Sequence, residues 1–430
     1  MKKILVAGCG HGGLSAACTL AEKGYDVTVF EKRRREDLGY DWHDSMRRNT
    51  FEKIGVPLPD ESVFSPMERK TYSNPKKTVK LFLPAPKSNN ISYIDRKFLI
   101  NYLIDHAEKC GVKFIFKCEV ICAAYDKNGV TGLTVSGKNG PETISADLVI
   151  DALGMYSPVR KGLPVEFGIQ NEISYENVFC VWRGYFERTD KSEDDEFNIY
   201  FYHCNNPGMD WAIKKNGYYD IMIGGFGKLS RENVETALSD FRKTYPDMTD
   251  KLLRGGCFGK IPIGKTLPVF VCDGYALVGD SAAMTEPLSG SGLDMSLKAG
   301  KILADTIIEN DDMKKESLWK YNYRFFKEHT EKYYNDAMIK GFLSAVTAQD
   351  IDFFFEKKIL TEKEMSGGGS TKYTLSEILK KGAVLKKPRL IMALKSVISW
   401  ALASIEAKKA IPEKYDRAQI EKFKAIYSKF

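Results

Sequence analysis

The glycines near the start of the chain have the spacing of a phosphate-binding loop. They lie in Gly8-Cys9-Gly10-His11-Gly12-Gly13, after the apolar run of residues 3–8 and before a helix-compatible run at 14–23. Gly8 permits a tight turn, Gly10 lets the backbone approach a pyrophosphate, and Gly13 lets helix and strand pack closely. The free N–H groups at a helix start attract phosphate oxygens. These residues predict a site for the pyrophosphate of a dinucleotide.

An acidic residue stands at the distance where such sites bind a ribose. Residues 25–30, YDVTVF, are typical of a second strand, and Glu31 at its end lies 21 positions after Gly10. Its carboxylate can accept hydrogen bonds from both ribose hydroxyls, and its charge would repel a 2′-phosphate. We assign the neighbouring Lys32 to the same site. This order of strand, turn, helix and second strand, ending in an acidic residue, predicts a dinucleotide-binding unit. It does not show whether the dinucleotide is NAD or FAD.

A second segment carries a carboxylate and a glycine-rich loop. Residues 275–300, YALVGDSAAMTEPLSGSGLDMSLKAG, indicate a buried strand that ends at Gly279 and Asp280, then a loop, then an amphipathic helix. The carboxylate can bind a ribityl or ribose hydroxyl, and the loop lets a second helix N-terminus approach a ligand. If that ligand is a flavin, these N–H groups face the ring edge that is negative in the reduced form. The loop residues assigned to the site are Pro287, Gly290, Ser291 and Gly292.

A third segment brings out a family resemblance. Residues 147–160, DLVIDALGMYSPVR, place Gly154, Ser157 and Arg160 after a strand. With it, the chain resembles the FAD-dependent superfamily of p-hydroxybenzoate hydroxylase-type aromatic hydroxylases and geranylgeranyl reductases, whose three motifs follow one another in this order. The resemblance covers about residues 1–300. It implies FAD as the cofactor, and it implies that Arg96, at the start of a helical segment, reaches the FAD pyrophosphate.

Residues 209–227, MDWAIKKNGYYDIMIGGFG, indicate the branch of the superfamily. They are similar to the segment of geranylgeranyl reductases in which Y-x-W-x-F-P precedes G-x-G. Trp211 and the glycines at 225 and 227 match, whereas Met209, Ile213 and Lys214 depart from that pattern. In the third segment, Leu153 stands where hydroxylases usually carry Asp. The resemblance therefore favours a reductase and makes Trp211 a candidate for the catalytic site.

His43 is the second candidate for catalysis. It lies in residues 38–50, LGYDWHDSMRRNT, where the chain of the resembled fold turns back toward the flavin ring. An imidazole can donate a proton near neutral pH, and an adjacent carboxylate such as Asp44 can tune it. The alternative is a role at the surface or at a phosphate.

The implied reaction is the reduction of carbon–carbon double bonds in a large apolar substrate, isoprenoid-like or polycyclic, by hydride transfer from N5 of reduced FAD. Two alternatives stay open: an aromatic or polyketide monooxygenase, and a flavin-binding electron-transfer module without catalysis. Because no second strand–G-x-G-x-x-G–helix unit appears in the sequence, we expect a transient electron donor, NAD(P)H or ferredoxin. We expect no nucleic-acid partner.

The cysteines and histidines indicate neither a metal site nor a disulfide framework. The nine cysteines are scattered without a CxxC pair, and only five histidines are present. A chain of this size with such cysteine usage is typical of the reducing cytosol. We therefore expect no metal and a cytoplasmic protein.

The strand and helix patterns of the sequence predict an α/β fold, which is α+β overall. With 43% hydrophobic and 28% charged residues, the 430-residue chain is too apolar to be disordered. We expect a Rossmann-like FAD-binding domain with an inserted antiparallel-sheet substrate domain and a helical C-terminal region. Alternating aromatic and β-branched residues predict the sheet, with residues 190–196, DKSEDDE, as a hairpin loop. The expected boundaries are 1–165 (FAD-binding, with a small insertion near 60–92), 166–265 (sheet), 266–330 (FAD-binding) and 331–430 (helical, with a flexible break at 366–370).

The basic excess of the chain lies in its C-terminal tail. The net charge is +7, and residues 370–430 alone hold 14 Lys/Arg against 5 Asp/Glu. Residues 390–405 are apolar apart from Lys395, too short to span a bilayer, and flanked by lysines and arginine. An interfacial helix at 386–409 would place the protein peripherally at the inner face of a membrane. A helix packed on the body or in a dimer is the alternative, and the sequence predicts no oligomeric state.

Overall fold

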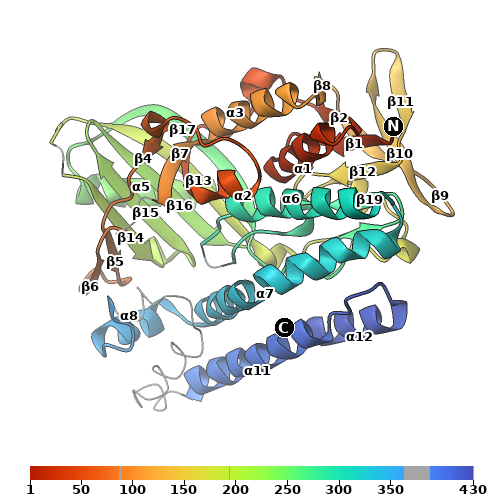
Figure 1. Ribbon diagram of the computed structural model, residues 1–430. Helices are drawn as coiled ribbons and strands as arrows, with labels where there is room; N and C mark the ends of the chain where they lie inside the picture. Colours follow the sequence, from red (N-terminus) through yellow and green to blue (C-terminus); the bar gives the residue numbers. More distant parts are fainter. Residues whose placement is uncertain (87–89, 193, 288, 363–387, 430) are drawn as a thin grey trace.

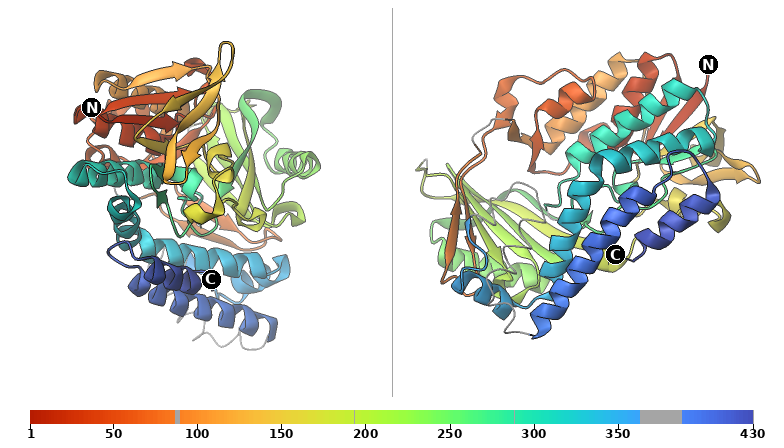
Figure 2. Two further views of the ribbon diagram at one scale, coloured as in Figure 1. Left: turned by 90° about the vertical axis from the view of Figure 1, so that its right-hand side faces the viewer. Right: turned by 60° about the horizontal axis from the view of Figure 1, so that its bottom comes forward.

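Two large β-sheets and a set of long helices form the described part of the chain (Figure 1). The computed structural model describes residues 1–86, 90–192, 194–287, 289–362 and 388–429. One sheet carries the glycine motifs, the other lies beside it, and the C-terminal helices run along one side of both (Figure 2). The α/β architecture predicted from the sequence is confirmed.

The first sheet has six strands in the order β18-β19-β12-β1-β2-β8, parallel except for β18. The strands are β1 (Lys3–Ala7), β2 (Asp26–Glu31), β8 (Lys113–Phe116), β12 (Leu148–Asp151), β18 (Val271–Cys272) and β19 (Tyr275–Leu277). Val6 of β1 lies between Val29 and Ile150, and all three side chains are fully buried. Continuous apolar runs form such strands because helices or loops cover both faces of a parallel sheet.

Three helices position the first two motifs. They are α1 (His11–Glu22), α3 (Arg96–Lys109) and α6 (Leu293–Asn310). Helix α1 packs against both α3 and α6. The contact with α6 is close enough to require glycine, since a Cβ on Gly300 would lie 2.0 Å from the carbonyl oxygen of Gly12. This approach brings the start of α1 next to the start of α6.

Smaller elements complete the first unit. One antiparallel sheet has the order β11-β10-β9, and another has the order β3-β7-β4. Their strands are β3 (His43–Arg47), β4 (Phe64–Ser65), β7 (Ile91–Asp95), β9 (Val120–Asp126), β10 (Gly129–Gly137) and β11 (Gly140–Ser145). The short helices of both units are α2 (Asn49–Lys53), α4 (Pro158–Lys161), η1 (Arg35–Asp37), η2 (Glu61–Val63), η3 (Val165–Phe167), η4 (Tyr175–Asn177), η5 (His203–Asn205) and η6 (Gly279–Ala282). Strand β7 leads directly into α3, so it sets the position of Arg96.

The second sheet has seven strands in the order β17-β13-β16-β15-β14-β5-β6. They are β5 (Lys70–Ser73), β6 (Lys80–Leu83), β13 (Val178–Arg188), β14 (Glu196–Phe201), β15 (Met209–Lys215), β16 (Tyr218–Phe226) and β17 (Met248–Pro262). All neighbours are antiparallel except β5 and β14. Helix α5 (Arg231–Thr244) covers one face with Val234 and Phe241. The opposite face is left to line a cavity.

The predicted hairpin loop at 190–196 is wrong. Strands β13 and β14 are separated by β16 and β15, so the segment between them crosses over two strands. The buried Arg188 donates hydrogen bonds to Asp190 and Asp194 of this segment at 2.8 and 3.1 Å, and to Asp247, just before β17, at 2.6 Å. The acidic composition therefore reflects a buried guanidinium that needs carboxylate partners.

The small insertion expected near 60–92 contributes two strands to the second sheet, because β5 pairs in parallel with β14 and β6 pairs with β5. We propose that the domains keep the boundaries given above, with these two strands completing the sheet of the substrate domain. The break expected at 366–370 lies outside the described residues.

The C-terminal helices are α7 (Lys315–Ala345), α8 (Ala348–Glu356), α11 (Pro388–Ala410) and α12 (Arg417–Tyr427). Helix α11 runs along α7, as all views in Figures 1 and 2 show. Helix α12 is tied to the core, because the Tyr427 hydroxyl donates to the carbonyl of Thr266 at 2.6 Å. The Trp319 indole likewise donates to the carbonyl of Pro412 at 2.8 Å. None of the helices in the described ranges combines the length and apolar composition needed to cross a membrane.

Candidate functional site

A cavity of about 970 Å³ extends from the glycine loop after β1 to the uncovered face of the second sheet. Its walls come from both units: the glycine loop, the segment around β3, the starts of α3 and α6, and strands β13, β14 and β15. Most of the residues assigned to a site from the sequence line it. The exceptions are Gly13 and Pro287, which lie outside the lining.

The glycine loop has the conformation that its residue types predict. Gly8 has φ of +86°, a left-handed value that favours glycine. A Cβ on Gly13 would lie 2.9 Å from Cγ1 of Val6, so glycine lets α1 pack onto β1. A Cβ on Gly10 would lie 2.7 Å from the carbonyl oxygen of Ala152, so this glycine also accommodates the chain after β12. Gly10 caps α1 without a side-chain hydrogen bond, which leaves backbone N–H groups facing the cavity.

Glu31 and Lys32 line the cavity at the end of β2. The Glu31 carboxylate is buried and accepts hydrogen bonds from the backbone N–H of Cys9 at 3.1 Å and of Arg33 at 3.0 Å. These two bonds hold the carboxylate against the glycine loop. A carboxylate oxygen accepts more than one hydrogen bond, so Glu31 keeps acceptor capacity for hydroxyl groups in the cavity.

The second motif places a carboxylate and a helix start on the same cavity. Asp280 accepts a hydrogen bond from the Thr285 hydroxyl at 2.9 Å, and burial raises the pKa of its carboxyl group. Helix α6 begins after Gly292 without a side-chain cap. Gly290, Ser291 and Gly292 all line the cavity. Two uncapped helix N-termini, those of α1 and α6, therefore face one cavity.

Three buried polar atoms on the cavity wall have no hydrogen-bond partner among the described residues. They are Nε2 of His11, Nε of Arg96 and Nε1 of Trp211. Burial and then Arg96 hold the pKa of His11 well below its usual value, so its imidazole is neutral. Unpaired buried polar atoms are costly and are typical of sites that a ligand completes. Together with the uncapped helices, they fit a ligand in which a pyrophosphate joins a nucleoside to a polar ring system, as in FAD.

An ion-pair network links the two units across the cavity, and the sequence did not indicate it. Asp44 accepts hydrogen bonds from Nη1 of Arg96 at 2.8 Å and from Nη1 of Arg183 at 3.2 Å. Arg183 also donates from Nε to Asp220 at 2.8 Å. Arg183 is buried on β13, and its side chain lies over the ring of Trp211 at 5.2 Å. A charged residue inside the apolar strand sequence ENVFCVWRGYFER was the signal that could have revealed it.

His43 lines the cavity from β3, but Asp44 is not the carboxylate beside its ring. Its Nδ1 lies 3.4 Å from the Tyr185 hydroxyl, and its Nε2 lies 3.9 Å from Asp95. Burial first, then the charge of Arg254, lower the pKa of His43 below its usual value of 6.5. The imidazole is therefore mostly neutral at pH 7, and protonation requires acidic conditions.

The far half of the cavity is apolar. Side chains of the second sheet line it, among them Phe197, Ile199, Ile213 and Met222. Lys70 adds an amine whose pKa is lowered by burial, with its nitrogen 5.3 Å from the centre of the Phe197 ring. This half offers aromatic and aliphatic walls to a large apolar ligand.

Residues of the third motif stabilise the loops of the site through buried hydrogen bonds. Buried Asp151 accepts hydrogen bonds from the Tyr275 hydroxyl at 2.6 Å and the Ser281 hydroxyl at 2.9 Å. Fully buried Arg160 donates to the carbonyls of Met155 and Ser281. These bonds hold the Gly279–Ala282 turn against the chain after β12, and they explain the charged residues in that motif.

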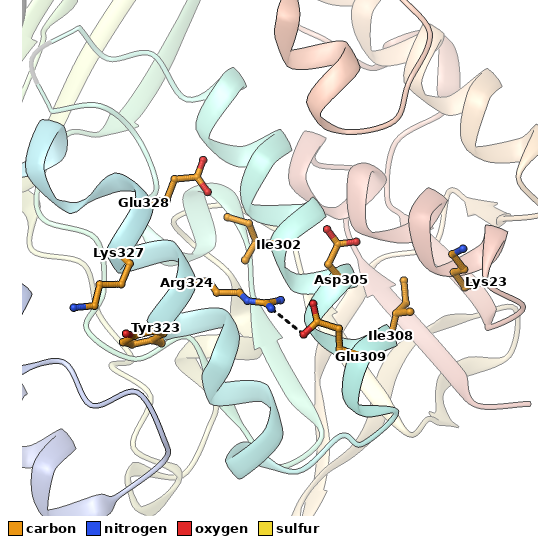
Figure 3. A pocket seen from close by; sticks show the side chains of 9 residues that line it. All are labelled: Lys23, Ile302, Asp305, Ile308, Glu309, Tyr323, Arg324, Lys327 and Glu328. Atoms are coloured by element: carbon orange, nitrogen blue, oxygen red, sulfur yellow. Dashed lines mark hydrogen bonds and ion pairs between the residues drawn. The ribbon is translucent and has the colours of Figure 1, made fainter.

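A second pocket lies between α6 and α7, away from the motifs (Figure 3). Within its lining, Arg324 pairs with Glu309 at 2.8 Å. None of the residues assigned to a site from the sequence lines it. The residues assigned to a site from the sequence therefore belong to the first cavity and not to this pocket.

Curated relatives match over most of the chain. One is the digeranylgeranylglycerophospholipid reductase of Sulfolobus acidocaldarius, 22% identical, with 96% of this chain and 92% of the relative covered. Another is the enzyme of the same name from Methanosphaerula palustris, 26% identical, with 71% of this chain and 76% of the relative covered.

Solved structures show the same fold. A geranylgeranyl bacteriochlorophyll reductase-like protein from Thermoplasma acidophilum is 20% identical and superimposes with a TM-score of 0.74, covering 92% of this chain and 99% of its own. The myxobacterial chondrochloren halogenase, an FAD-dependent enzyme, is 17% identical with a TM-score of 0.61, covering 88% and 96%.

A family model described as "FAD binding domain" matches residues 1–243, more than half of the chain. The match includes the glycine loop, Glu31, Arg96 and the third motif. The cavity they form fits FAD on its geometry, and the relatives that match over most of the chain are reductases. The chain therefore belongs to the FAD binding domain family, and it is an FAD-dependent oxidoreductase.

Proposed function

We propose that this oxidoreductase reduces carbon–carbon double bonds in a large apolar, isoprenoid-like substrate. The observation that carries the proposal is the continuity of one cavity from the nucleotide loop to the apolar face of the second sheet. A small polar substrate would leave the apolar wall of the cavity in contact with water. The names of the curated relatives, which are reductases of a geranylgeranylated glycerophospholipid, support the same substrate class.

We propose that FAD is held by the residues assigned from the sequence. The two uncapped helix starts and Arg96 bind the pyrophosphate, Glu31 binds the ribose, and Asp280 binds the ribityl chain. The remaining residues of the proposed site are Gly8, Gly10, Gly12, Gly13, Lys32, Gly279, Pro287, Gly290, Ser291 and Gly292. Gly13 and Pro287 act on the shape of the loops rather than by contact.

When bound and reduced, FAD supplies a hydride at N5. The chain's own residues position the alkene and provide the proton. Trp211 and its apolar neighbours exclude water from the alkene and hold it flat against the cavity wall. His43 is the proton donor through its ring, with Tyr185 next to Nδ1. Arg183 and Asp44 hold Trp211 and Arg96 in place through their shared network.

The test is an anaerobic turnover experiment with chemically reduced protein and a geranylgeranylated glycerophospholipid. We expect the product mass to rise by one H₂ for each double bond reduced. Protein kept oxidised is the matched control and should leave the lipid unchanged. A product that instead gains one oxygen atom, and only in air, would replace this proposal with a monooxygenase. Flavin that cycles with a donor but changes no substrate would indicate an electron-transfer module.

The electron donor in this proposal is transient. The first sheet provides one dinucleotide loop, and the described residues contain no second strand–G-x-G-x-x-G–helix unit. NADH, NADPH and reduced ferredoxin are the donors to compare by the rate of flavin bleaching without oxygen. The fastest of the three identifies the donor class.

We also propose that α11 contacts an anionic membrane surface. Met392, Lys395, Leu402, Ile405 and Lys409 recur at spacings of three, four and seven positions, which places them on one face of the helix. Met392 and Leu402 are 65% and 64% exposed. Exposed apolar side chains among lysines are typical of helices that lie in a membrane interface. Such contact would bring the cavity to a lipid substrate.

A further inference from the structure

Four side chains with metal-binding atoms meet on helices α1 and α3, outside the cavity. Cys18 and Glu22 lie one turn apart near the end of α1, and His106 and Cys110 lie one turn apart at the end of α3. Their ligand atoms all lie within 4.8 Å of one another. Residues at i and i+4 share a helix face, so each helix presents two donors to the other. This arrangement needs no further residue to complete a four-ligand set.

Two of the separations between ligand atoms are close to those of a tetrahedral metal centre. Sγ of Cys110 lies 3.3 Å from the Glu22 carboxylate and 3.8 Å from Nε2 of His106. Metal–ligand bonds of about 2.0–2.3 Å give ligand separations of roughly 3.4–3.8 Å in a tetrahedron. The two sulfur atoms are closer, at 2.6 Å, and must separate by about 1 Å. Cys110 is half-buried, so rotation of its side chain can provide this movement.

We propose that Cys18, Glu22, His106 and Cys110 bind one Zn²⁺ ion. Two thiolates, an imidazole and a carboxylate are the ligand types that zinc prefers, whereas Mg²⁺ and Ca²⁺ favour oxygen ligands alone. Both thiols release their protons to solvent on binding. Four protein ligands leave no open position, so the site is structural rather than catalytic.

The position of this zinc site gives it a role in cofactor binding. Helices α1 and α3 both begin at the cavity, with His11 and Arg96 on its wall, and the zinc site joins the same helices at their other ends. Zinc at this position holds the two helices together, and with them Arg96 and the start of α1, both of which we assign to the pyrophosphate. The site is independent of which substrate the enzyme reduces.

A disulfide between Cys18 and Cys110 is the competing reading of the short sulfur contact. It would use two of the four donors and would leave the convergence of Glu22 and His106 without a function. It would also require an oxidant, such as hydrogen peroxide, to take up two electrons and two protons. A zinc titration of the reduced protein distinguishes a zinc site from a disulfide.

The test uses the full-length, FAD-loaded protein, stripped of metal with a chelator and a reductant and then titrated with Zn²⁺ without oxygen. We expect one equivalent to bind and the melting temperature to rise. Co²⁺ in place of Zn²⁺ should give the visible bands of a tetrahedral centre and a near-ultraviolet thiolate charge-transfer band. His106→Gln and Cys110→Ser should weaken binding by at least about tenfold. Cys122→Ser, a half-buried cysteine on β9, is the matched control and should bind zinc as the parent does.

Two results would overturn the proposal. One is a reduced parent protein that binds no zinc above the level of the Cys110→Ser variant. The other is Co²⁺ bound without a thiolate band. If Cys110→Ser does not fold, Glu22→Gln serves in its place, since Glu22 is exposed and its loss removes one ligand only. Protein isolated with two thiols blocked as a disulfide, and unable to bind zinc after reduction, would establish the disulfide instead.

Discussion

Asp44 shows how single residues connect the two halves of the site. It lies beside His43 in the sequence, yet its carboxylate bonds to Arg96 and Arg183 and to the Trp42 indole. Asp95, at the end of β7, is the carboxylate near the His43 ring. One acidic residue thus joins the proposed pyrophosphate-binding arginine to the buried arginine of the substrate sheet. Removing Arg183 would leave the buried carboxylate of Asp220 without its guanidinium partner.

Glu31 gives the first prediction at this scale. In Glu31→Ala, the Cys9 N–H loses its acceptor and the ribose loses its carboxylate. Hydrogen bonds to charged groups contribute about 1.5–3 kcal/mol, so we expect FAD to bind roughly 10- to 100-fold more weakly. Flavin absorbance per protein and a titration with FAD measure this. Glu36→Ala, an exposed position nearby, should keep a full flavin content. A full flavin load in Glu31→Ala would show that the ribose site has been misassigned.

His43 gives a prediction in its pH dependence. Burial lowers the pKa of its imidazole below 6.5, so the protonated donor is populated only as the pH falls below that value. We therefore expect kcat/KM to rise as the pH is lowered and to level off below the pKa of His43. His43→Gln should be slower and should lose this rise. Tyr185→Phe keeps the imidazole and should keep the dependence. An unchanged profile in His43→Gln would remove His43 from the mechanism.

At the scale of elements, the contact of α1 with α6 places two helix starts on one cavity. Gly12 and Gly300 form this contact, since any side chain at 300 would meet backbone of α1. The crossover from β13 to β14 and the pairing of β5 with β14 similarly build the face that lines the apolar half. The cavity is therefore formed by contacts between elements, and each contact brings residues from distant parts of the chain to its wall.

Gly300→Ala tests this contact. A methyl group 2.0 Å from the Gly12 carbonyl must push the helices apart, and overpacking of this kind costs about 1–3 kcal/mol of unfolding free energy. Urea unfolding should show the lower midpoint, and FAD binding should weaken with it. Lys301→Ala, the next residue on α6, should stay within about 0.5 kcal/mol of the parent. Equal stability of the two variants would mean that the helices have room to separate.

At the scale of the whole molecule, the C-terminal helices belong to the body of the protein. Tyr427 and Trp319 tie α12 and the end of α11 to the core. Truncation after Gly369 would therefore remove packed helices and expose core surface. Point variants on the outer face of α11 are the sound test of membrane contact.

The double variant Leu402→Glu with Ile405→Glu should reduce binding to vesicles that contain anionic lipid. Both side chains are exposed, so folding should be preserved, whereas two apolar contacts are replaced by charges that such lipids repel. Co-sedimentation with anionic and neutral vesicles measures the effect. Leu58→Glu, at an exposed position on the first unit, is the control. Binding that is unchanged would leave α11 as a helix of the body only.

Residue types and their spacing were enough to predict the parts of the site that lie within a few residues of one another. The left-handed turn at Gly8, the uncapped start of α1 and the acid at the end of β2 follow from residue types at fixed spacing, because backbone geometry is set locally. The aromatic and β-branched residues in 166–265 likewise predict strands, because strand propensity is a local property, although β13 and β16 turn out to be buried on both faces. The C-terminal helix around 390–405 is of the same kind.

Contacts between side chains that are distant in the sequence depend on how the elements pack. Periodicity says which face of an element is buried, but it does not say against what. The strand order that makes 189–195 a crossover, the link from Asp44 to Arg183, and Asp95 beside His43 all arise from packing between remote segments. Cys18 and Cys110 stand 92 positions apart, so no spacing motif could indicate them. They meet because α1 and α3 pack side by side on one sheet, and the free energy of burying both helices selects that contact.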